Sequence, residues 1–265
     1  MSDWRSYDRV AEVYERVHAP RFAEVGRDLV AQAGIGPGMR VLDVGTGTGV
    51  TAEAGRAAGA DATGLDRAVG MLRAGRKARP DVPLVAGEVI DLPFRDGAFD
   101  AVIGSFVLAH FAKVETALFD IRRVTRPGGG VGFTAWSDGR DAYEDTWIEQ
   151  VTTVVPRDML APAYAGAAPG HDRFKDPNAI QDVLRRAGYR SVRTERRRYQ
   201  WTYARDDYVE GLGCWAVGRF VHDMLGDAAW ASFLDRARAA FADRFPDPLN
   251  DFRDVIVATA SLPAS

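Results

Sequence analysis

The sequence predicts an α/β fold of the Rossmann-like, doubly wound kind, with a mostly parallel sheet of seven strands. Two observations carry this prediction. Short apolar runs of strand length alternate with helical segments over the first half of the chain, and the connections between them are short. Such βαβ alternation places parallel strands side by side and covers both faces of the sheet with helices. The 265 residues suffice for one such domain with insertions.

Seven segments have the length and composition of strands. They are apolar or alternating runs that are bounded mostly by glycine, proline or polar residues. In chain order they are residues 39–44, 62–65, 82–85, 99–103, 131–135, 191–201 and 252–260. Pro127 and the three glycines that follow it predict a turn before the fifth strand.

Helices are expected between the strands, because apolar residues recur there three and four positions apart. The predicted helices cover residues 21–33, 51–58, 68–78, 114–124, 143–154 and 177–187, with several more within 205–243. Five residues of that last stretch share one helical face and should pack an inserted helix on the core: Trp230, Phe233, Leu234, Ala237 and Phe241.

The strand–helix pattern is interrupted twice, which bears on how the chain is organised. We interpret residues 1–265 as a single domain with two insertions, 137–176 and 202–249. Ligands of doubly wound sheets bind at the carboxyl ends of the strands. The two helical insertions and the N-terminal segment 1–22 are therefore expected to fold over that edge as a substrate lid.

Composition and charge exclude several classes of protein. Lys and Arg number 34 and Asp and Glu 37, so the net charge is −3 and a nucleic-acid partner is not expected. The single cysteine, Cys214, excludes an internal disulfide, and the four histidines have no metal-ligand spacing, so no metal is expected. No apolar stretch reaches the roughly 18 residues of a membrane span, and the N-terminus lacks the form of a signal peptide. We expect a cytoplasmic protein, monomeric or homodimeric, without a membrane partner.

The most informative motif is the run from Val41 to Gly49, in which a strand ends in three closely spaced glycines and opens a helix. Glycines at such a turn let a ligand approach the backbone, because no Cβ intervenes. A dinucleotide site would have the spacing G-x-G-x-x-G. Here the third glycine arrives one residue early, Val50 follows it, and an acid, Asp43, stands two residues before the first glycine.

This arrangement resembles motif I of the class I S-adenosylmethionine-dependent methyltransferases, an acid followed by G-x-G-x-G. Further segments resemble later motifs of that family in the same order: Gly64-Leu65-Asp66, the run from Gly87 to Phe94, the run from Phe99 to Phe111, and the run from Arg122 to Gly129. The likeness covers about residues 5–136. It is greatest to the small-molecule branch typified by the ubiquinone and menaquinone methyltransferases.

The resemblance implies a cofactor, S-adenosylmethionine, and residues that hold it. Asp66 would accept hydrogen bonds from the ribose hydroxyls, Glu88 and Val89 would line the adenine, and the loop after the fourth strand would lie beside the methionine part. The implied cofactor residues are Asp43, Gly45, Thr46, Gly47, Gly49, Asp66, Arg67, Met71, Glu88, Val89, Ser105 and His110. This chain departs from the family at Val89, where an alanine is common, and at Phe111, where a second histidine is common.

Several of these residues also have structural interpretations. Asp66 is placed to cap the helix that begins near Ala68, and Glu88 is placed as a solvated loop acid. His110 is a packing or hinge residue rather than a base in this interpretation. Arg193 and Arg196–198 alternate with other residues as on the exposed face of an edge strand, which accounts for them without a nucleic acid.

The function that follows is methyl transfer by in-line displacement to a small, aromatic or apolar molecule. The segments expected over the site are rich in aromatic residues, and the substrate candidates are Tyr7, Tyr14, Trp136, Tyr164 and Trp215. His171 and His222, one in each insertion, are the candidates for a general base. Two alternatives remain: a fold relative that binds S-adenosylmethionine without transferring the methyl group, and an NAD-dependent oxidoreductase.

Overall fold

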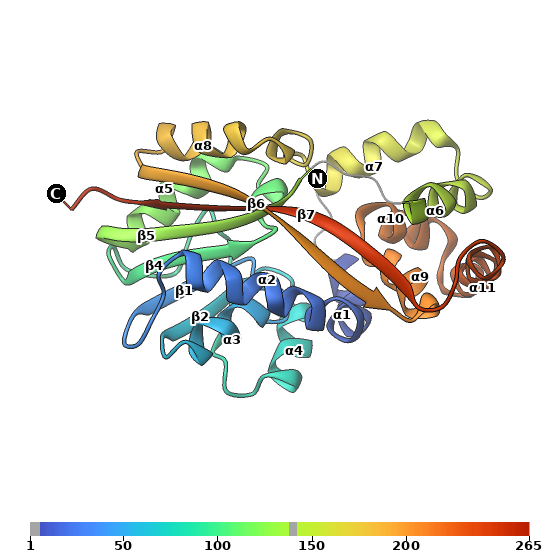
Figure 1. Cartoon of the computed structure of the whole chain (residues 1–265), viewed down its shortest axis with the longest axis horizontal. Coiled ribbons are helices and arrows are strands. Elements are labelled where there is room, and N and C mark those ends of the chain that lie inside the picture. Colours follow the sequence, from blue (N-terminus) through green and yellow to red (C-terminus); the bar gives the residue numbers. More distant parts are fainter. Residues whose placement is uncertain (1–5, 138–141, 265) are drawn as a thin grey trace.

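One twisted sheet of seven strands organises the molecule (Figure 1). The computed structural model describes residues 6–137 and 142–264. The strands lie in the order β3-β2-β1-β4-β5-β7-β6. The first five in that order pair in parallel, and β7 is antiparallel to both of its neighbours. The bounds are β1 Arg40–Val44, β2 Asp61–Asp66, β3 Leu84–Ala86, β4 Phe99–Ser105, β5 Thr125–Trp136, β6 Arg190–Tyr203 and β7 Leu249–Ser261. The predicted fold class is confirmed.

Helices cover both faces of the sheet, because neighbouring residues of each central strand point to opposite sides. Leu42 is buried in the core under α5 and α8, whereas Val41 is buried in the core under α2 and α3. These helices and α4 have the bounds α2 Ala19–Gln32, α3 Val50–Ala57, α4 Val69–Ala78, α5 Val114–Val124 and α8 Pro177–Arg186. Figure 1 shows α5 and α8 above the sheet and α2 and α3 below it.

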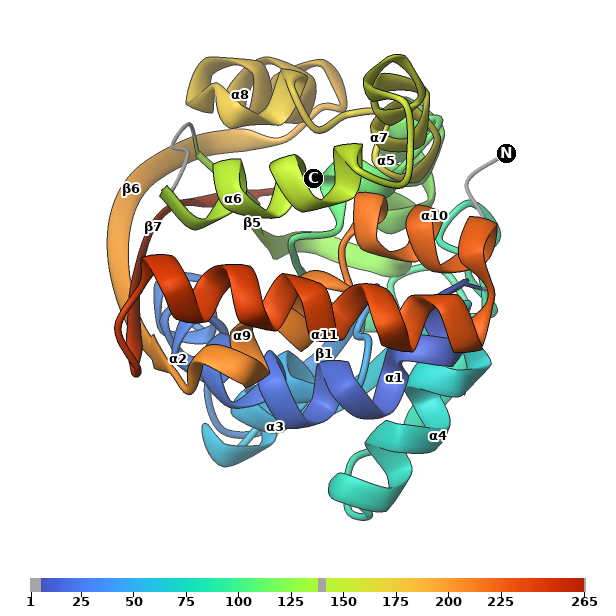
Figure 2. The same cartoon turned by 90° about the vertical axis from the view of Figure 1, so that its right-hand side faces the viewer.

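The remaining helices gather beyond one end of the sheet, around the carboxyl end of β5 (Figures 1 and 2). They are α1 Ser6–Val17, α6 Ala142–Thr152, α7 Leu160–Ala167, α9 Arg205–Leu212, α10 Ala216–Leu225 and α11 Asp227–Arg244. Short 3-10 turns are Leu108–His110, Arg157–Met159 and Arg173–Lys175. A second hydrophobic core joins these helices, and it contains the five predicted residues of α11, all of them buried. No helix in the described part of the chain is long and apolar enough to cross a membrane.

One predicted turn is wrong. The prediction places a turn at Pro127 and the following glycines. In the structure, strand β5 begins earlier, at Thr125, and includes these residues. The pairing of β4 with β5 shifts register between Phe99 and Ala101, and Gly128 adopts a φ of 72°. A Cβ on Gly129 would lie 2.8 Å from the Asp100 carbonyl oxygen. The glycines therefore let an irregular strand start pass close to its neighbour, which composition alone does not distinguish from a turn.

Candidate active site

The glycine bend between β1 and α3 is built from backbone that only glycine adopts readily. Gly45, Gly47 and Gly49 have φ values of 66°, 58° and 92°, which lie in the left-handed region. A Cβ on Gly45 would overlap the side chain of Val107, and one on Gly47 would lie 3.4 Å from Met71 Cε. The bend is therefore required both by conformation and by the close approach of its neighbours.

Asp43 lies beneath this bend and is fully buried. Its Oδ2 accepts hydrogen bonds from Thr46 Oγ1 at 2.5 Å and from the Ala52 amide at 3.1 Å. Its Oδ1 has no hydrogen-bond partner among the described residues. Burial raises the pKa of Asp43 to about 7, and the two hydrogen bonds oppose this rise. The carboxyl thus fixes the shape of the bend and leaves one buried acceptor oxygen unsatisfied.

Asp66, at the end of β2, joins the bend to the next helix. Its Oδ2 accepts from the Gly47 amide and its Oδ1 from the Ala68 amide, both at 2.8 Å. Burial raises the pKa of Asp66, and these backbone donors act against the rise. A carboxylate has about four acceptor positions, and the amides of Gly47, Ala68 and Arg67 use at most three of them, so a ribose hydroxyl and the helix start can use the same carboxylate. The ligand role and the structural role of Asp66 are therefore compatible.

Helix α1 covers the glycine bend. Tyr14 Cε1 lies 4.0 Å from the position of a Cβ on Gly47. Burial raises the pKa of Tyr14, so its phenol is neutral at physiological pH. Asp8 Oδ1 accepts from the Gly70 amide at 2.6 Å and so fastens α1 to the first turn of α4. Figure 2 shows α1 lying beside α4.

The loop after β4 holds a strained residue. Phe106 has a φ of 56°, which is uncommon for a residue with a side chain. Its amide donates to the carbonyl and to Oγ1 of Thr134, and its ring stacks on Trp136 with centroids 4.1 Å apart. Next to it, Ser105 Oγ accepts from Thr51 Oγ1 at 3.1 Å. Strained backbone held by its surroundings is characteristic of binding sites, so this loop is a candidate wall of the site.

Aromatic rings from distant segments extend this wall. Trp215 lies edge-on to Trp136 at 6.2 Å and against His18 at 4.6 Å. Phe22 contacts Phe106 at 5.1 Å. A cavity of about 10 Å³ adjoins the wall, roughly the space of one water-sized sphere. It is lined by Phe106, Ala109, Thr134, Ala135, Trp136, His171 and Phe174.

The two insertion histidines occupy different surroundings. His171 lines the cavity beside Trp136, and burial, together with Lys175, lowers its pKa, which keeps the imidazole neutral. His222 lies at the junction of α10 and α11, where Nε2 is 2.9 Å from Asp227 Oδ1 and the ring stacks on Trp230 at 4.8 Å. The structure thus brings His171 to the aromatic wall, and the contacts of His222 lie within the helical insertion.

His110 has the environment of a packing residue. Its Nδ1 lies 2.9 Å from the Ala167 carbonyl oxygen, and its ring is edge-on to Tyr7 with centroids 6.2 Å apart. Burial lowers the pKa of His110 to about 4. A neutral, fixed imidazole is suited to shaping the site rather than to accepting a proton.

The residues predicted to line the adenine are more exposed to solvent than those at the glycine bend. Glu88 is exposed and forms an isolated bridge with Asp91, whereas Val89 packs against the core under α5. Arg67 is partly buried directly after Asp66. The side chain of Tyr164 lies outside the described part of the structure. The ligand roles of these residues stay predictions.

Two buried residues of the site region were missed by sequence reasoning. His18 is 3% exposed, with Nε2 2.9 Å from the Gly211 carbonyl oxygen, and Arg219 is 5% exposed, with its guanidinium over the ring of Tyr7. Neither lies in a motif, because each acquires its neighbours from segments about 200 residues away. The only signal in the sequence was their place within segments already expected to form a lid.

Comparisons with known proteins agree with this geometry. A methyltransferase-domain family matches residues 42–133. The demethylmenaquinone methyltransferase of Renibacterium salmoninarum is 47% identical over 173 residues, which are 63% of this chain and 73% of that protein. The corresponding Streptomyces avermitilis protein is 31% identical over 198 residues, 70% of this chain and 85% of its own length. Phosphoethanolamine N-methyltransferase 2 of Haemonchus contortus, solved with S-adenosyl-L-methionine, shares the fold with a TM-score of 0.60 at 16% identity, over 99% of this chain and 60% of that one.

The strand order and the glycine bend define a nucleoside-binding α/β enzyme. Together with these matches they show the family: the chain belongs to the class I S-adenosylmethionine-dependent methyltransferases. Its cofactor is S-adenosylmethionine, and its reaction is methyl transfer to a small molecule. The predicted family, enzyme class and cofactor are confirmed.

The residues present fit this cofactor. The bend has no Cβ on Gly47, and Asp66 offers two oxygens to a vicinal diol. The unsatisfied Oδ1 of Asp43 is a hydrogen-bond acceptor close to the bend, which suits a ligand that bears an ammonium group. Asp66 would hold the ribose, and the backbone of the bend would lie against the amino-acid part.

Proposed function

We propose that the methyl acceptor of this enzyme is a flat, apolar molecule with a hydroxylated aromatic ring. The observation that carries the proposal is the stack of Phe106 on Trp136, at the carboxyl ends of β4 and β5; β4 pairs with β1, the strand that leads into the glycine bend. Trp215 and Phe22 extend the same wall. Aromatic faces of this kind accommodate a planar ring and also attract the positive charge of a sulfonium.

The named relatives narrow the acceptor class. Two of them are demethylmenaquinone methyltransferases, and the sequence similarity to the Renibacterium protein covers 63% of this chain. We therefore favour the reduced form of a quinone, a hydroquinone, as the acceptor. A hydroquinone is flat and apolar, and it carries acidic hydroxyl groups whose loss of a proton makes both oxygen and ring carbon nucleophilic.

Bound S-adenosylmethionine supplies a methyl group that is already activated on sulfur. The protein therefore has to hold and orient the reactants, which contributes up to about 7–11 kcal/mol. In this proposal the bend and Asp66 hold the cofactor, α1 with Tyr14 excludes water, and Phe106 and Trp136 orient the acceptor ring. The new bond joins the methyl carbon to the acceptor, the sulfur–methyl bond breaks, and the acceptor's proton leaves.

His171 is the proposed proton acceptor. It lines the cavity beside Trp136, where a bound acceptor would be within its reach, and burial lowers its pKa and so keeps the imidazole in the unprotonated form that a general base requires. A positioned base contributes a factor of about 10²–10⁴. His222 is the second candidate, and the carboxylate of Asp227 next to it is the observation in its favour.

The test is methyl transfer from radiolabelled S-adenosylmethionine into matched acceptors. A set of naphthalene and benzene hydroquinones, their dimethyl ethers, and amines of the same size separates the possibilities. We expect label in the hydroquinones and little in the ethers or amines. Preferential labelling of the amines would overturn the acceptor class. Cofactor binding without labelling of any acceptor would favour the alternative of a protein that binds the cofactor structurally.

The NAD alternative has a separate test, calorimetric titration with S-adenosylmethionine and with NAD side by side. We expect heat of binding only for the first. A cytoplasmic location, the monomeric or homodimeric state, and the absence of nucleic-acid and membrane partners stay predictions, as does the role of residues 1–22, 137–176 and 202–249 as a lid.

A further inference from the structure

Arg219 of α10 is a buried arginine without a carboxylate partner in the described part of the chain. It is 5% exposed. Its Nε donates to Ser6 Oγ at 2.8 Å, and its Nη1 donates to the Cys214 carbonyl oxygen. Its Cζ lies 3.7 Å from the centre of the Tyr7 ring. A guanidinium has five N–H donors, and those bonds use one at Nε and one at Nη1. Buried arginines are rare unless they are paired with an anion.

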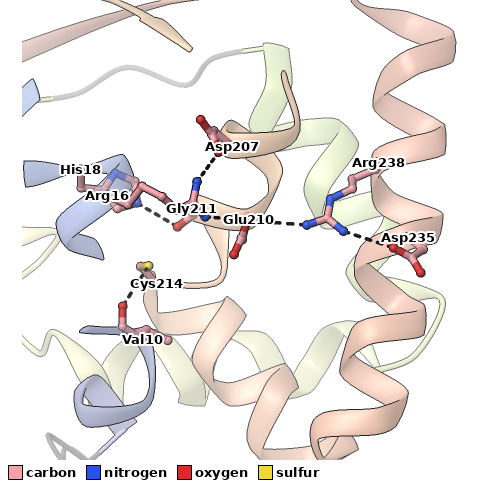
Figure 3. A network of polar contacts seen from close by, with 9 residues as sticks. All are labelled: Val10, Arg16, His18, Asp207, Glu210, Gly211, Cys214, Asp235 and Arg238. Atoms are coloured by element: carbon pink, nitrogen blue, oxygen red, sulfur yellow. Dashed lines mark hydrogen bonds and ion pairs between the residues drawn. The ribbon is translucent and has the colours of Figure 1, made fainter. Parts of the chain in front are cut away.

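The acids near Arg219 are engaged elsewhere. Figure 3 shows Glu210 of α9 between Arg16 and Arg238, with ion-pair distances of 2.8 and 3.6 Å. Asp207 pairs with the same Arg16. On α10 itself, Asp223 pairs with Arg9 at 2.6 Å. The positive charge of Arg219 is therefore not neutralised by these acids.

Residues of α1 connect Arg219 to the side of the molecule where the glycine bend lies. Tyr7, which lies under the guanidinium, is edge-on to His110 on the loop after β4. Two turns further along α1, Tyr14 lies over Gly47 of the bend. A line of contacts thus runs from the bend across α1 to Arg219.

Other positive groups surround the same loop. The guanidinium groups of Arg219 and Arg67 both act on His110 as positive neighbours, in addition to its burial. The acids on this side have other partners: Asp66 accepts from the Gly47 and Ala68 amides, Asp8 accepts from the Gly70 amide, and Asp172 pairs with Lys175 at 2.9 Å. Arg219 is thus a positive group beside Tyr7 that an anionic ligand group would neutralise.

We propose that Arg219 binds the carboxylate at the methionyl end of S-adenosylmethionine. The inference depends on the cofactor and not on the acceptor, which is neutral in the proposed function. The methionyl carboxylate is the anion that every catalytic cycle brings to this region. Arginine binds carboxylates in a forked, charge-assisted geometry, and the free donors of Arg219 permit this without loss of the contacts to Ser6 and Cys214.

The test compares two ligands that differ only in this group, S-adenosylmethionine and decarboxylated S-adenosylmethionine, by calorimetry without acceptor. We expect Arg219→Gln to raise the Kd for S-adenosylmethionine about 10- to 100-fold, in line with a lost charged hydrogen bond. The Kd for the decarboxylated ligand should change less than about threefold. Arg219→Lys, which keeps charge but not the fork, should lie between Gln and wild type.

Arg236→Gln is the matched control, because Arg236 is exposed on α11 and donates to the Ser232 carbonyl of its own helix. It should leave both affinities unchanged. Equal weakening of both ligands by Arg219→Gln would overturn the proposal, since it would mean that Arg219 only fastens α1. Unchanged affinity for both ligands would overturn it as well. If Arg219→Gln does not fold, the ratio of the two Kd values in Arg219→Lys decides the question.

Discussion

Replacement of Asp43 by Asn tests the electrostatic description of the glycine bend. The folded pKa of Asp43 is about 7, against an ordinary value of 3.8. Folding therefore favours the protonated form, and the resulting stability is complete below the unfolded pKa and is lost as pH rises through the folded pKa. One pKa unit corresponds to about 1.4 kcal/mol. Ionisation of this carboxyl should therefore lower the free energy of unfolding of the apoprotein by about 2–3 kcal/mol as the pH rises from 5 to 8.

The assay is urea unfolding of the wild type and of Asp43→Asn at pH 5, 6, 7 and 8. The amide keeps the size of the carboxyl and an oxygen that can accept from Thr46, but it does not ionise. We expect the free energy of unfolding of the wild type to fall relative to the variant as pH rises. Other titrating groups are common to both proteins and cancel in the difference. Two parallel curves would refute the buried, proton-binding description of Asp43.

The difference between variants is needed because His18 acts in the opposite direction. Burial lowers the pKa of His18 to about 4. The neutral imidazole therefore contributes to the free energy of unfolding above the unfolded pKa of 6.5, and this contribution is lost as the pH falls. Between pH 7 and pH 5 this loss is about 2 kcal/mol. The wild-type profile is therefore flatter than either effect alone. His18→Gln should remove the acid-side loss and leave the effect of Asp43 in place.

Three further predictions concern ligands. Gly47→Ala should raise the Kd for S-adenosylmethionine, measured by calorimetry, at least about tenfold, because a methyl group there faces Met71 and Tyr14. Gly34→Ala is the control, since Gly34 has a similar φ of 66° and nothing within 4 Å of its Cβ position; it should lower the free energy of unfolding by about 1–2 kcal/mol and leave the Kd unchanged. Equal Kd values for the wild type and Gly47→Ala would contradict the placement of the cofactor at the glycine bend. His171→Ala should lower kcat about 10²- to 10⁴-fold in single-turnover assays, and a larger loss in His222→Ala would move the base to α10. Trp136→Leu should raise KM for the acceptor about 5- to 30-fold and leave the Kd for the cofactor unchanged. A higher Kd for the cofactor with an unchanged acceptor KM would show that Trp136 does not contact the acceptor.

What the sequence predicts well is local. The glycine bend and Asp43 lie within one short stretch of chain, so their spacing predicts a ligand-binding turn, whereas the role of Asp66 is implied by the family resemblance. The same holds for strands β1 to β4, whose bounds differ from the prediction by one or two residues at most. The start of β5 was missed because its glycines serve a close strand approach, and that approach exists only once β4 is beside it.

The acceptor side shows the limit of such reasoning. Its rings come from five segments: Phe22 from α2, Phe106 from the loop after β4, Trp136 from the end of β5, Trp201 from β6 and Trp215 from the turn before α10. An aromatic residue in a helix or strand is ordinarily a core residue, and several of these rings do pack against the second core. Only the folded arrangement shows that two of them, Phe106 and Trp136, also line the cavity.

The N-terminal helix connects the two halves of the site. Tyr14 lies over the glycine bend, the proposed cofactor site, while Tyr7 lies between His110 and Arg219. Several of the ion pairs that fasten α1 to the insertion helices, such as Arg9 with Asp223, are largely exposed, and exposed pairs contribute only about 0–1 kcal/mol each. A ligand carboxylate on Arg219 would add a buried, charged contact on the far side of Tyr7. Cofactor binding would then stabilise the position of α1 and, through Tyr7 and His110, the loop that carries Phe106.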